Sequence, residues 1–197
     1  MYIIGITGGT GAGKSSAVKA LQALGAQALD CDAIYHEVLL GNADMKAEIK
    51  AQFPSAATDG EIDRKKLGEI VWNNPDSLQK LNKITHKYMD KEIDNRINAL
   101  RQQNTGIAVI DAIALIESGQ GKKCNATVGI CAPQEKRLSR IIQRDNLTEE
   151  HANKRVKAQQ PESFYRENCD YILENIYNTE AEFEEKCTVF FKELIHE

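Results

Sequence analysis

The chain has 197 residues, of which 42% are hydrophobic and 27% are charged, and its formal net charge is -4. This size and composition fit one α/β domain with inserted segments, whereas the acidic balance argues against a nucleic-acid coat and no apolar run is long enough to span a membrane. The five cysteines show no C-x-x-C spacing and a strand begins at once, so we expect free thiols, no leader peptide and a cytoplasmic protein.

The first elements predict a phosphate-binding loop. An apolar strand at 2–6 leads into residues 8–15, GGTGAGKS, which match the pattern G-x-x-x-x-G-K-[ST], and a helix is expected over 14–24. Glycines let successive backbone N–H groups face one anion, and the helix N-terminus adds its dipole. Lys14 would reach the β- and γ-phosphates of ATP, and the Ser15 hydroxyl would hold Mg²⁺. The residues expected to bind nucleotide here are Gly9, Thr10, Gly11, Ala12, Gly13, Lys14, Ser15 and Ser16.

The second strand, expected over 27–30, ends in a pair of aspartates, Asp30 and Asp32. The carboxyl edge of a doubly wound sheet holds the ligand, and an extended chain would point both carboxylates the same way. Asp32 could therefore orient an acceptor hydroxyl, the alternative being that it only caps the next helix. For Asp30, two interpretations remain: it supports Mg²⁺ through water, or it has no such role.

The stretch 38–104 is too long for a simple crossover and predicts an inserted helical lobe. Its helices are expected at 43–52, 64–72 and 75–100. Asp63 can cap the second of them after a turn at Asp59-Gly60, and Trp72 is expected in the core. A lobe of this size is most simply a substrate-binding device, and a purely structural elaboration is the alternative.

Five strand-like runs separated by helical segments predict a parallel sheet with helices on both faces. The runs lie at 2–6, 27–30, 107–111, 127–131 and 171–173. Asp111, which ends the third, could bind Mg²⁺ through water or cap a turn. The acidic stretch from 174 predicts an amphipathic helix, whose apolar side chains are Phe183, Cys187, Phe190, Phe191 and Leu194.

Residues 136–166 carry eight basic and four acidic side chains, which predicts an arginine-bearing lid for phosphoryl transfer. Arg140 and Arg144 share one helix face, and Arg155 and Gln159 repeat that spacing on the next helix. Clustered guanidiniums can clamp phosphate oxygens. Surface pairing with nearby carboxylates is the competing interpretation.

Several classes of nucleotide protein are compatible with a phosphate loop. A guanine-specific switch is disfavoured, because the nearest match to N-K-x-D, at 82–85, lacks the aspartate. Another small-acceptor kinase, acting on a nucleoside monophosphate or a sugar, remains open. A regulatory protein that only changes conformation is a further alternative, which the aspartates and the arginine-rich segment disfavour.

Taken together, these residues resemble the dephospho-coenzyme A kinase family over nearly the whole chain. The matching segments are 4–15, 29–32, 59–64, 67–68, His86, 116–119, 144–148, and Arg155 followed by Gln159. Three positions depart from the family. His36 stands where the family often has Arg, residues 111–117 read DAIALIE for D-x-P-L-L-F-E, and His86-Lys87 replaces His-Pro.

The resemblance implies a P-loop NTPase fold with a nucleoside-monophosphate-kinase-like core at 1–37, 105–135 and 167–197. It implies a helical coenzyme-A-binding insertion at 38–104 and a basic lid at 136–166. The expected reaction moves the γ-phosphate of ATP to the 3′-hydroxyl of dephospho-coenzyme A, the last step of coenzyme A synthesis, with Mg²⁺. We expect no nucleic-acid or membrane partner, and a monomer or small homo-oligomer.

The resemblance also implies three groups of site residues. The group that aligns the acceptor and stabilises the transferred phosphate contains Asp32, Lys14, Arg140 and Arg144. The group that joins loop residues 9–16 in binding ATP contains Arg144, Arg155 and Asn175, with Mg²⁺ on Ser15. The group that contacts the acceptor contains Asp32, His86, Arg155 and Gln159.

Overall fold

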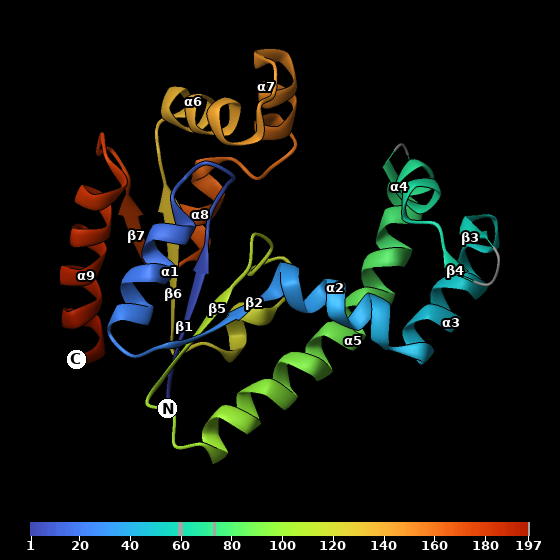
Figure 1. Cartoon of the computed structure of the whole chain (residues 1–197), viewed down its shortest axis with the longest axis horizontal. Coiled ribbons are helices and arrows are strands. Elements are labelled where there is room, and N and C mark those ends of the chain that lie inside the picture. The colour runs from blue at the N-terminus through green and yellow to red at the C-terminus, as the bar shows by residue number, and fades with distance from the viewer. Residues whose placement is uncertain (59–60, 73, 197) are drawn as a thin grey trace. The chain divides into compact units, whose positions relative to one another are not determined.

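The computed structural model describes every residue except 59, 60, 73 and 197 (Figure 1). The described chain forms two compact units. The sheet unit contains Met1–Asp30 and Ala99–Glu197, and the helical unit contains Cys31–Asn98. The expected insertion, 38–104, covers most of the helical unit, and the expected lid, 136–166, belongs to the sheet unit.

Five parallel strands form the sheet, in the order β2-β5-β1-β6-β7 (Figure 1). They are β1 (Tyr2–Thr7), β2 (Gln27–Asp30), β5 (Ile107–Asp111), β6 (Ala126–Cys131) and β7 (Tyr171–Glu174). The predicted parallel sheet is thereby confirmed. β1 and β6 are buried along nearly their whole length, as unbroken apolar runs in a parallel sheet require.

The strand register defines the edge of the sheet that matters for ligands. Asp30 lies opposite Asp111 in the β2–β5 pair, and Ile6 lies opposite Asp111 in the β1–β5 pair. The glycine-rich loop leaves β1 after Thr7. Asp30, Asp111 and this loop therefore share the carboxyl edge of neighbouring strands, where open α/β sheets bind their ligands.

Alternation along β1 separates the two faces of the sheet. Ile4 and Ile6 belong to the apolar core that also contains Leu21 of α1 (Lys14–Ala23) and Phe183 of α9 (Glu180–His196). Gly5 faces the other way, where a Cβ would lie 2.6 Å from a methyl group of Leu115. Both faces are thus covered. The predicted C-terminal helix is confirmed, with Phe183, Cys187, Phe191 and Leu194 buried.

Further helices complete the sheet unit. They are η2 (Gln120–Lys123), α6 (Gln134–Asp145), α7 (Glu149–Lys157) and α8 (Glu162–Asn168). Ile141 of α6 packs on Ala152 and Val156 of α7, in a small apolar core of their own. The oxygen of the Thr148 side chain accepts from the His151 N–H and so begins α7.

The helical unit is built from one long helix and several short elements around buried aliphatic side chains. Its elements are α2 (Cys31–Gly41), α3 (Ala43–Gln52), η1 (Pro54–Ala56), β3 (Ala57–Thr58), β4 (Glu61–Ile62), α4 (Arg64–Trp72) and α5 (Pro75–Gln102), which runs past the end of the unit. The three predicted helices are confirmed. Asp63 caps α4 as expected, because its Oδ1 accepts from the Lys65 and Lys66 N–H groups at 3.0 and 3.1 Å. The expected Asp59-Gly60 turn lies outside the described residues.

One prediction for the helical unit is wrong, and one pair of strands was not predicted. Trp72 is 81% exposed rather than part of the core. The buried residue of α4 is Leu67, and five helical residues correspond to about 500°, so Trp72 points well away from the buried side. The antiparallel pair β3–β4 was not predicted, because two-residue strands are too short to show alternation.

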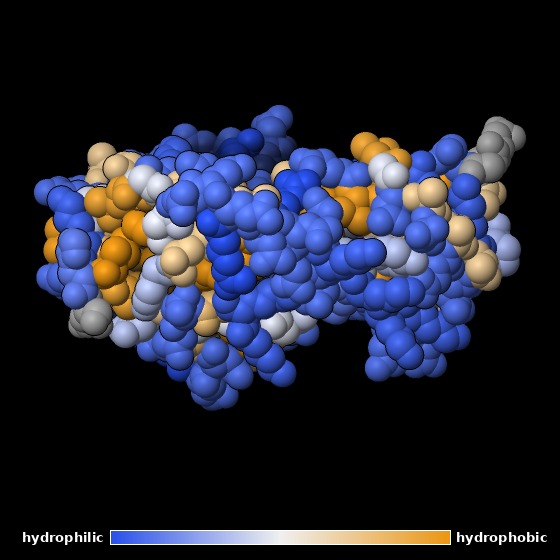
Figure 2. Space-filling model, turned by 90° about the horizontal axis from the view of Figure 1, so that it is seen from below, coloured by the Kyte–Doolittle hydropathy of each residue, from blue (hydrophilic) through white to orange (hydrophobic). Residues whose placement is uncertain are grey.

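The visible surface is mainly hydrophilic, with separate hydrophobic groups (Figure 2). Within the described part of the chain, no helix combines the length and the apolar character that crossing a membrane requires.

All five cysteines are free, and burial alters the chemistry of four of them. It raises the pKa of Cys124 and Cys187 to about 12 and that of Cys131 and Cys169 to about 11. A raised pKa keeps the thiol protonated near neutrality, and only the thiolate is a nucleophile.

We therefore expect iodoacetamide at pH 8 to modify Cys131 and Cys169 about a hundredfold more slowly in the folded protein than in urea, and Cys124 and Cys187 about a thousandfold more slowly. The folded-state rate should rise about tenfold per pH unit above pH 8 while the fold persists. Mass spectrometry of quenched time points measures both rates. Equal rates at pH 8 in the folded and unfolded chain would contradict the burial that raises these pKa values.

Candidate functional site

The glycine-rich loop joins β1 to α1 in a backbone conformation that needs its glycines. Gly13, the residue before α1, has φ 112° and lies in the left-handed region. A Cβ there would lie 2.3 Å from Asn175 Nδ2 and 3.1 Å from the Phe183 ring. Any side chain at this position would therefore disturb both the backbone and the packing behind the loop.

The start of α1 is prepared for an anion. Lys14 and Ser15 occupy its first turn, which contains no acidic residue. Helix N-termini present backbone N–H groups and the positive end of the helix dipole. Arg137 and Arg140 of α6 add positive charge beside the loop, because their guanidinium groups donate to the carbonyl oxygens of Thr10 and Gly11.

Arg140 and Asn175 hold the second half of the loop from two sides. Arg140 donates through Nη1 to Gly11 O at 3.1 Å and through Nη2 to Asn175 Oδ1 at 3.1 Å. Asn175 Nδ2 donates to Ala12 O at 2.9 Å, and the Asn175 N–H donates to Cys131 O at 2.7 Å. Asn175 is 3% exposed. The segment after β7 is thereby tied to the loop, and burial lowers the pKa of Arg140 below its ordinary value.

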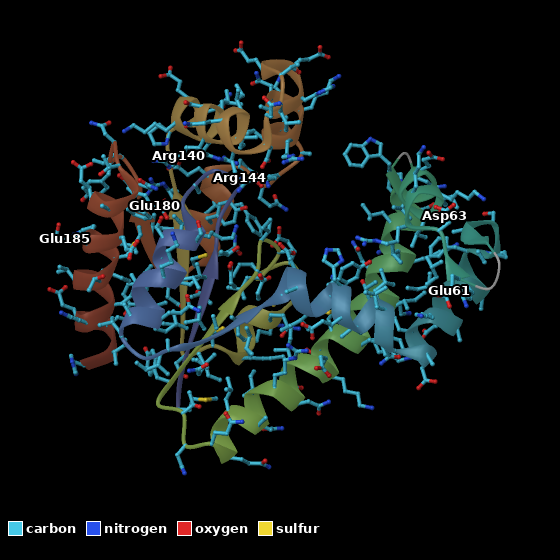
Figure 3. All side chains as sticks on the ribbon, viewed as in Figure 1. Glu61, Asp63, Arg140, Arg144, Glu180 and Glu185 are labelled. Carbon is cyan, nitrogen blue, oxygen red and sulfur yellow. The ribbon has the colours of Figure 1, made fainter. Side chains whose placement is uncertain are left out.

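Arg144 and Arg155, the other arginines singled out from the sequence, converge on one carboxylate. Arg144 donates through Nε to Asp145 Oδ1 at 2.7 Å and through Nη2 to Oδ2 at 2.9 Å, and Arg155 donates to the same Oδ2. Hydrogen bonding from Arg144 holds the pKa of Asp145 below its usual range. Figure 3 labels Arg140 and Arg144 on α6 above the carboxyl ends of the strands. The two guanidiniums are thus assembled around an anion.

Gln159 contacts the first half of the loop, although it does not lie on a helix as expected. α7 ends at Lys157, and Gln159 follows its C-cap, Ala158. Gln159 Oε1 accepts from the Thr10 N–H at 2.8 Å. It also accepts from Arg137, a residue that was not among the predicted site residues. The available signal was its position three residues before Arg140 on the same helix face.

The two aspartates do not continue one extended chain. α2 begins at Cys31, directly after β2, so Asp30 ends a strand and Asp32 lies in the first turn of a helix. Successive residues of a helix turn by about 100°, so the expected common direction of the two carboxylates does not hold. Asp32 is also inside the helix rather than at its N-cap, and its side chain is exposed.

The predicted residues are divided between the two units. The loop residues 9–16, Arg140, Asn175 and Gln159 come together in the sheet unit through the contacts above. Asp32 and His86 belong to the helical unit, where His86 is half-buried on α5.

Comparisons with known proteins agree on one family. A family model described as dephospho-CoA kinase matches residues 2–181. A dephospho-CoA kinase of Dehalococcoides mccartyi is 34% identical over 177 residues, which cover 89% of this chain and 89% of that protein.

Two solved structures are similar over almost the full length. A crystal structure from Thermus thermophilus has a TM-score of 0.81 at 29% identity, covering 98% of this chain and 97% of that one. A dephospho-CoA kinase from Campylobacter jejuni has a TM-score of 0.71 at 27% identity, with the same coverage.

Proposed function

The chain belongs to the dephospho-CoA kinase family, which phosphorylates dephospho-CoA in the final step of CoA biosynthesis, and we propose that its glycine-rich loop holds ATP while Asp32 prepares the acceptor. The observation that carries this proposal is the geometry of the loop. Gly8, Gly11 and Gly13 have a positive φ, which other residues rarely adopt, and the loop lies at the carboxyl edge of the sheet and at the start of a helix free of acidic residues.

The nucleotide site divides into a loop part and a lid part. Backbone N–H groups of the loop and the Lys14 ammonium bind the phosphates of ATP, whereas the N–H of Thr10 donates to Gln159 Oε1. Arg140 and Asn175 support the loop through Gly11 O and Ala12 O, and Asn175 places the segment after β7 beside the nucleotide. Arg144 and Arg155 leave Asp145 and contact the transferred phosphate, whose charge is spread over its oxygens in the transition state.

The oxygen atoms at the sheet edge fit Mg²⁺. Ser15 lies in the first turn of α1, and Asp30 and Asp111 lie opposite each other on β2 and β5. Among the described residues, no group of three or more His, Cys, Asp or Glu side chains could hold a metal ion alone. This suits an ion that binds one or two protein oxygens together with substrate phosphates. When bound, Mg²⁺ neutralises charge on the phosphates, and Ser15 would hold it.

The helical unit supplies the acceptor side. The exposed Asp32 carboxylate accepts a hydrogen bond from the 3′-hydroxyl of dephospho-CoA and aligns it with the γ-phosphorus. A carboxylate is a weak base, but a loose phosphoryl-transfer transition state requires mainly positioning. His86 and Arg155 complete the contacts to the acceptor, whereas the amide of Gln159 is engaged by Thr10 and Arg137 on the nucleotide side. Free thiols at all five cysteines fit the reducing cytoplasm, where we place the reaction.

An acceptor panel tests this proposal. We expect ATP consumption with dephospho-CoA to exceed that with AMP, CMP or gluconate by at least about a hundredfold, because each correctly paired substrate group strengthens discrimination. A coupled assay measures ADP release, and mass spectrometry identifies the product. Phosphorylation of another acceptor in preference to dephospho-CoA would overturn the assignment, and ATP turnover that ignores the acceptor would favour a conformational switch.

A further inference from the structure

Every polar atom of Thr10 is engaged by two side chains from the segment that follows β6. Its N–H donates to Gln159 Oε1 at 2.8 Å, and its Oγ1 accepts from Gln159 Nε2 at 2.6 Å. Its carbonyl oxygen accepts from Arg137 Nε at 3.0 Å. Thr10 lies in the first half of the nucleotide loop. This half is therefore held by protein groups independently of any ligand.

Arg137 also determines how Gln159 is oriented. Its Nη2 donates to Gln159 Oε1 at 2.8 Å, so two N–H donors converge on that atom. An amide nitrogen cannot accept them, and the oxygen must occupy this position. The amide nitrogen is then directed at Thr10 Oγ1. The planar guanidinium fork thus bonds Thr10 and Gln159 at once, which a single ammonium could not do in the same geometry.

The loop sequence is matched to this arginine. A Cβ at Gly9 would lie 2.2 Å from Arg137 Nη2 and 3.0 Å from Gln159 Oε1. A Cβ at Gly11 would lie 2.7 Å from Arg137 O. The glycines on either side of Thr10 therefore leave room for the side chain and the backbone of Arg137.

We propose that Arg137 is a positioning residue for ATP. Arg137 holds the first half of the nucleotide loop in its binding conformation, because it bonds Thr10 directly and also through Gln159. The inference rests on one part of the proposed function, which is that ATP binds at the loop. It does not depend on which acceptor is phosphorylated. The ordering of residues 9–11 is completed during folding, so ATP binding does not have to supply it. Arg137 acts on ATP affinity and not on the acceptor.

We expect Arg137→Ala to raise the Kd of ATP about tenfold, since a hydrogen bond from a charged donor is lost on each side of the clamp. The Kd of dephospho-CoA should stay within about twofold of wild type, because the clamp lies on the nucleotide loop. Isothermal calorimetry with each ligand alone measures both constants. The thermal midpoint, recorded on the same samples, shows whether the fold has loosened.

A second route to the same defect is Gly9→Ala, which displaces the guanidinium while leaving Arg137 in place. We expect a similar rise in the Kd of ATP for Gly9→Ala, and no further rise when both substitutions are combined, because they remove the same contact. Lys154→Ala is the matched control on α7. Its exposed ammonium pairs with Glu150 on the same helix, so the Kd of ATP should not change.

Wild-type ATP affinity in Arg137→Ala would overturn the inference, and so would additive effects of the two substitutions. Equal losses of affinity for ATP and dephospho-CoA, with a lower thermal midpoint, would show general loosening and also overturn it. If wild type binds ATP but does not phosphorylate dephospho-CoA, the proposed function fails while the Arg137 result stands. If wild type binds no ATP, both fail.

Discussion

Replacing Asp32 by asparagine is expected to lower kcat for dephospho-CoA phosphorylation by about 10²–10⁴, the usual contribution of a positioned acid–base group. Asparagine keeps the size of the side chain but removes the charge that orients the acceptor hydroxyl. The Kd of ATP should remain within about twofold of wild type, because the loop and lid contacts lie on the sheet unit. Steady-state kinetics and calorimetry with ATP alone separate the two effects.

Asp44→Asn provides the matched control. Asp44 is an exposed carboxylate in the first turn of α3, as Asp32 is in the first turn of α2, and both helices belong to the helical unit. If Asp32 serves only the dipole of its helix, each substitution should cost about 0.3–1 kcal/mol of stability and leave kcat unchanged. A kcat for Asp32→Asn equal to that of Asp44→Asn would remove Asp32 from the reaction.

Gly13→Ala is expected to lower the free energy of unfolding by about 2–5 kcal/mol and to abolish measurable ATP binding. A left-handed backbone costs an alanine about 1–2 kcal/mol, and forcing a methyl group into a packed site costs about 1–3 kcal/mol. The new Cβ would displace Asn175 Nδ2 and the ring of Phe183. Urea unfolding followed by circular dichroism measures the stability.

Gly25→Ala isolates the backbone contribution to this effect. Gly25 has φ 90°, but a Cβ there would meet no atom within 4 Å. Its substitution should therefore cost only about 1–2 kcal/mol and leave ATP binding intact. If both substitutions lowered the free energy of unfolding equally, the contacts with Asn175 and Phe183 would not be the reason that position 13 requires glycine.

The parts of this fold that were predictable are those whose signal is local. β1 and β6 are short apolar runs because both faces of a parallel sheet are covered, and α9 keeps one apolar side through Phe183 and Phe191. The loop at 8–15 was recognisable because its geometry needs glycines at set positions. Trp72 was misplaced because it lies in the final turn of α4, where apolar periodicity no longer distinguishes the buried side.

The contacts within the site could not be predicted in the same way. Arg137 and Thr10 are separated by 127 positions, and only the tertiary fold brings them together. The sequence shows Arg137 as one of several basic residues on an amphipathic helix, with nothing to mark its partner. The geometry at Asp32 was missed because α2 begins one residue after β2, a boundary that residue patterns place only to within a few positions. The roles of Asp32, His86 and the lid arginines stay predictions.

The carboxylate of Asp145 has a consequence for how Arg144 and Arg155 would respond to a bound phosphate. Arg144 and Arg155 are already paired with an internal anion, so binding a phosphate exchanges one counter-charge for another. The position of such an equilibrium depends on the difference between the two anions and not on the strength of either alone. Dissolved salt screens both pairings, so their difference is less sensitive to ionic strength than the attraction of bare arginines for a triphosphate would be.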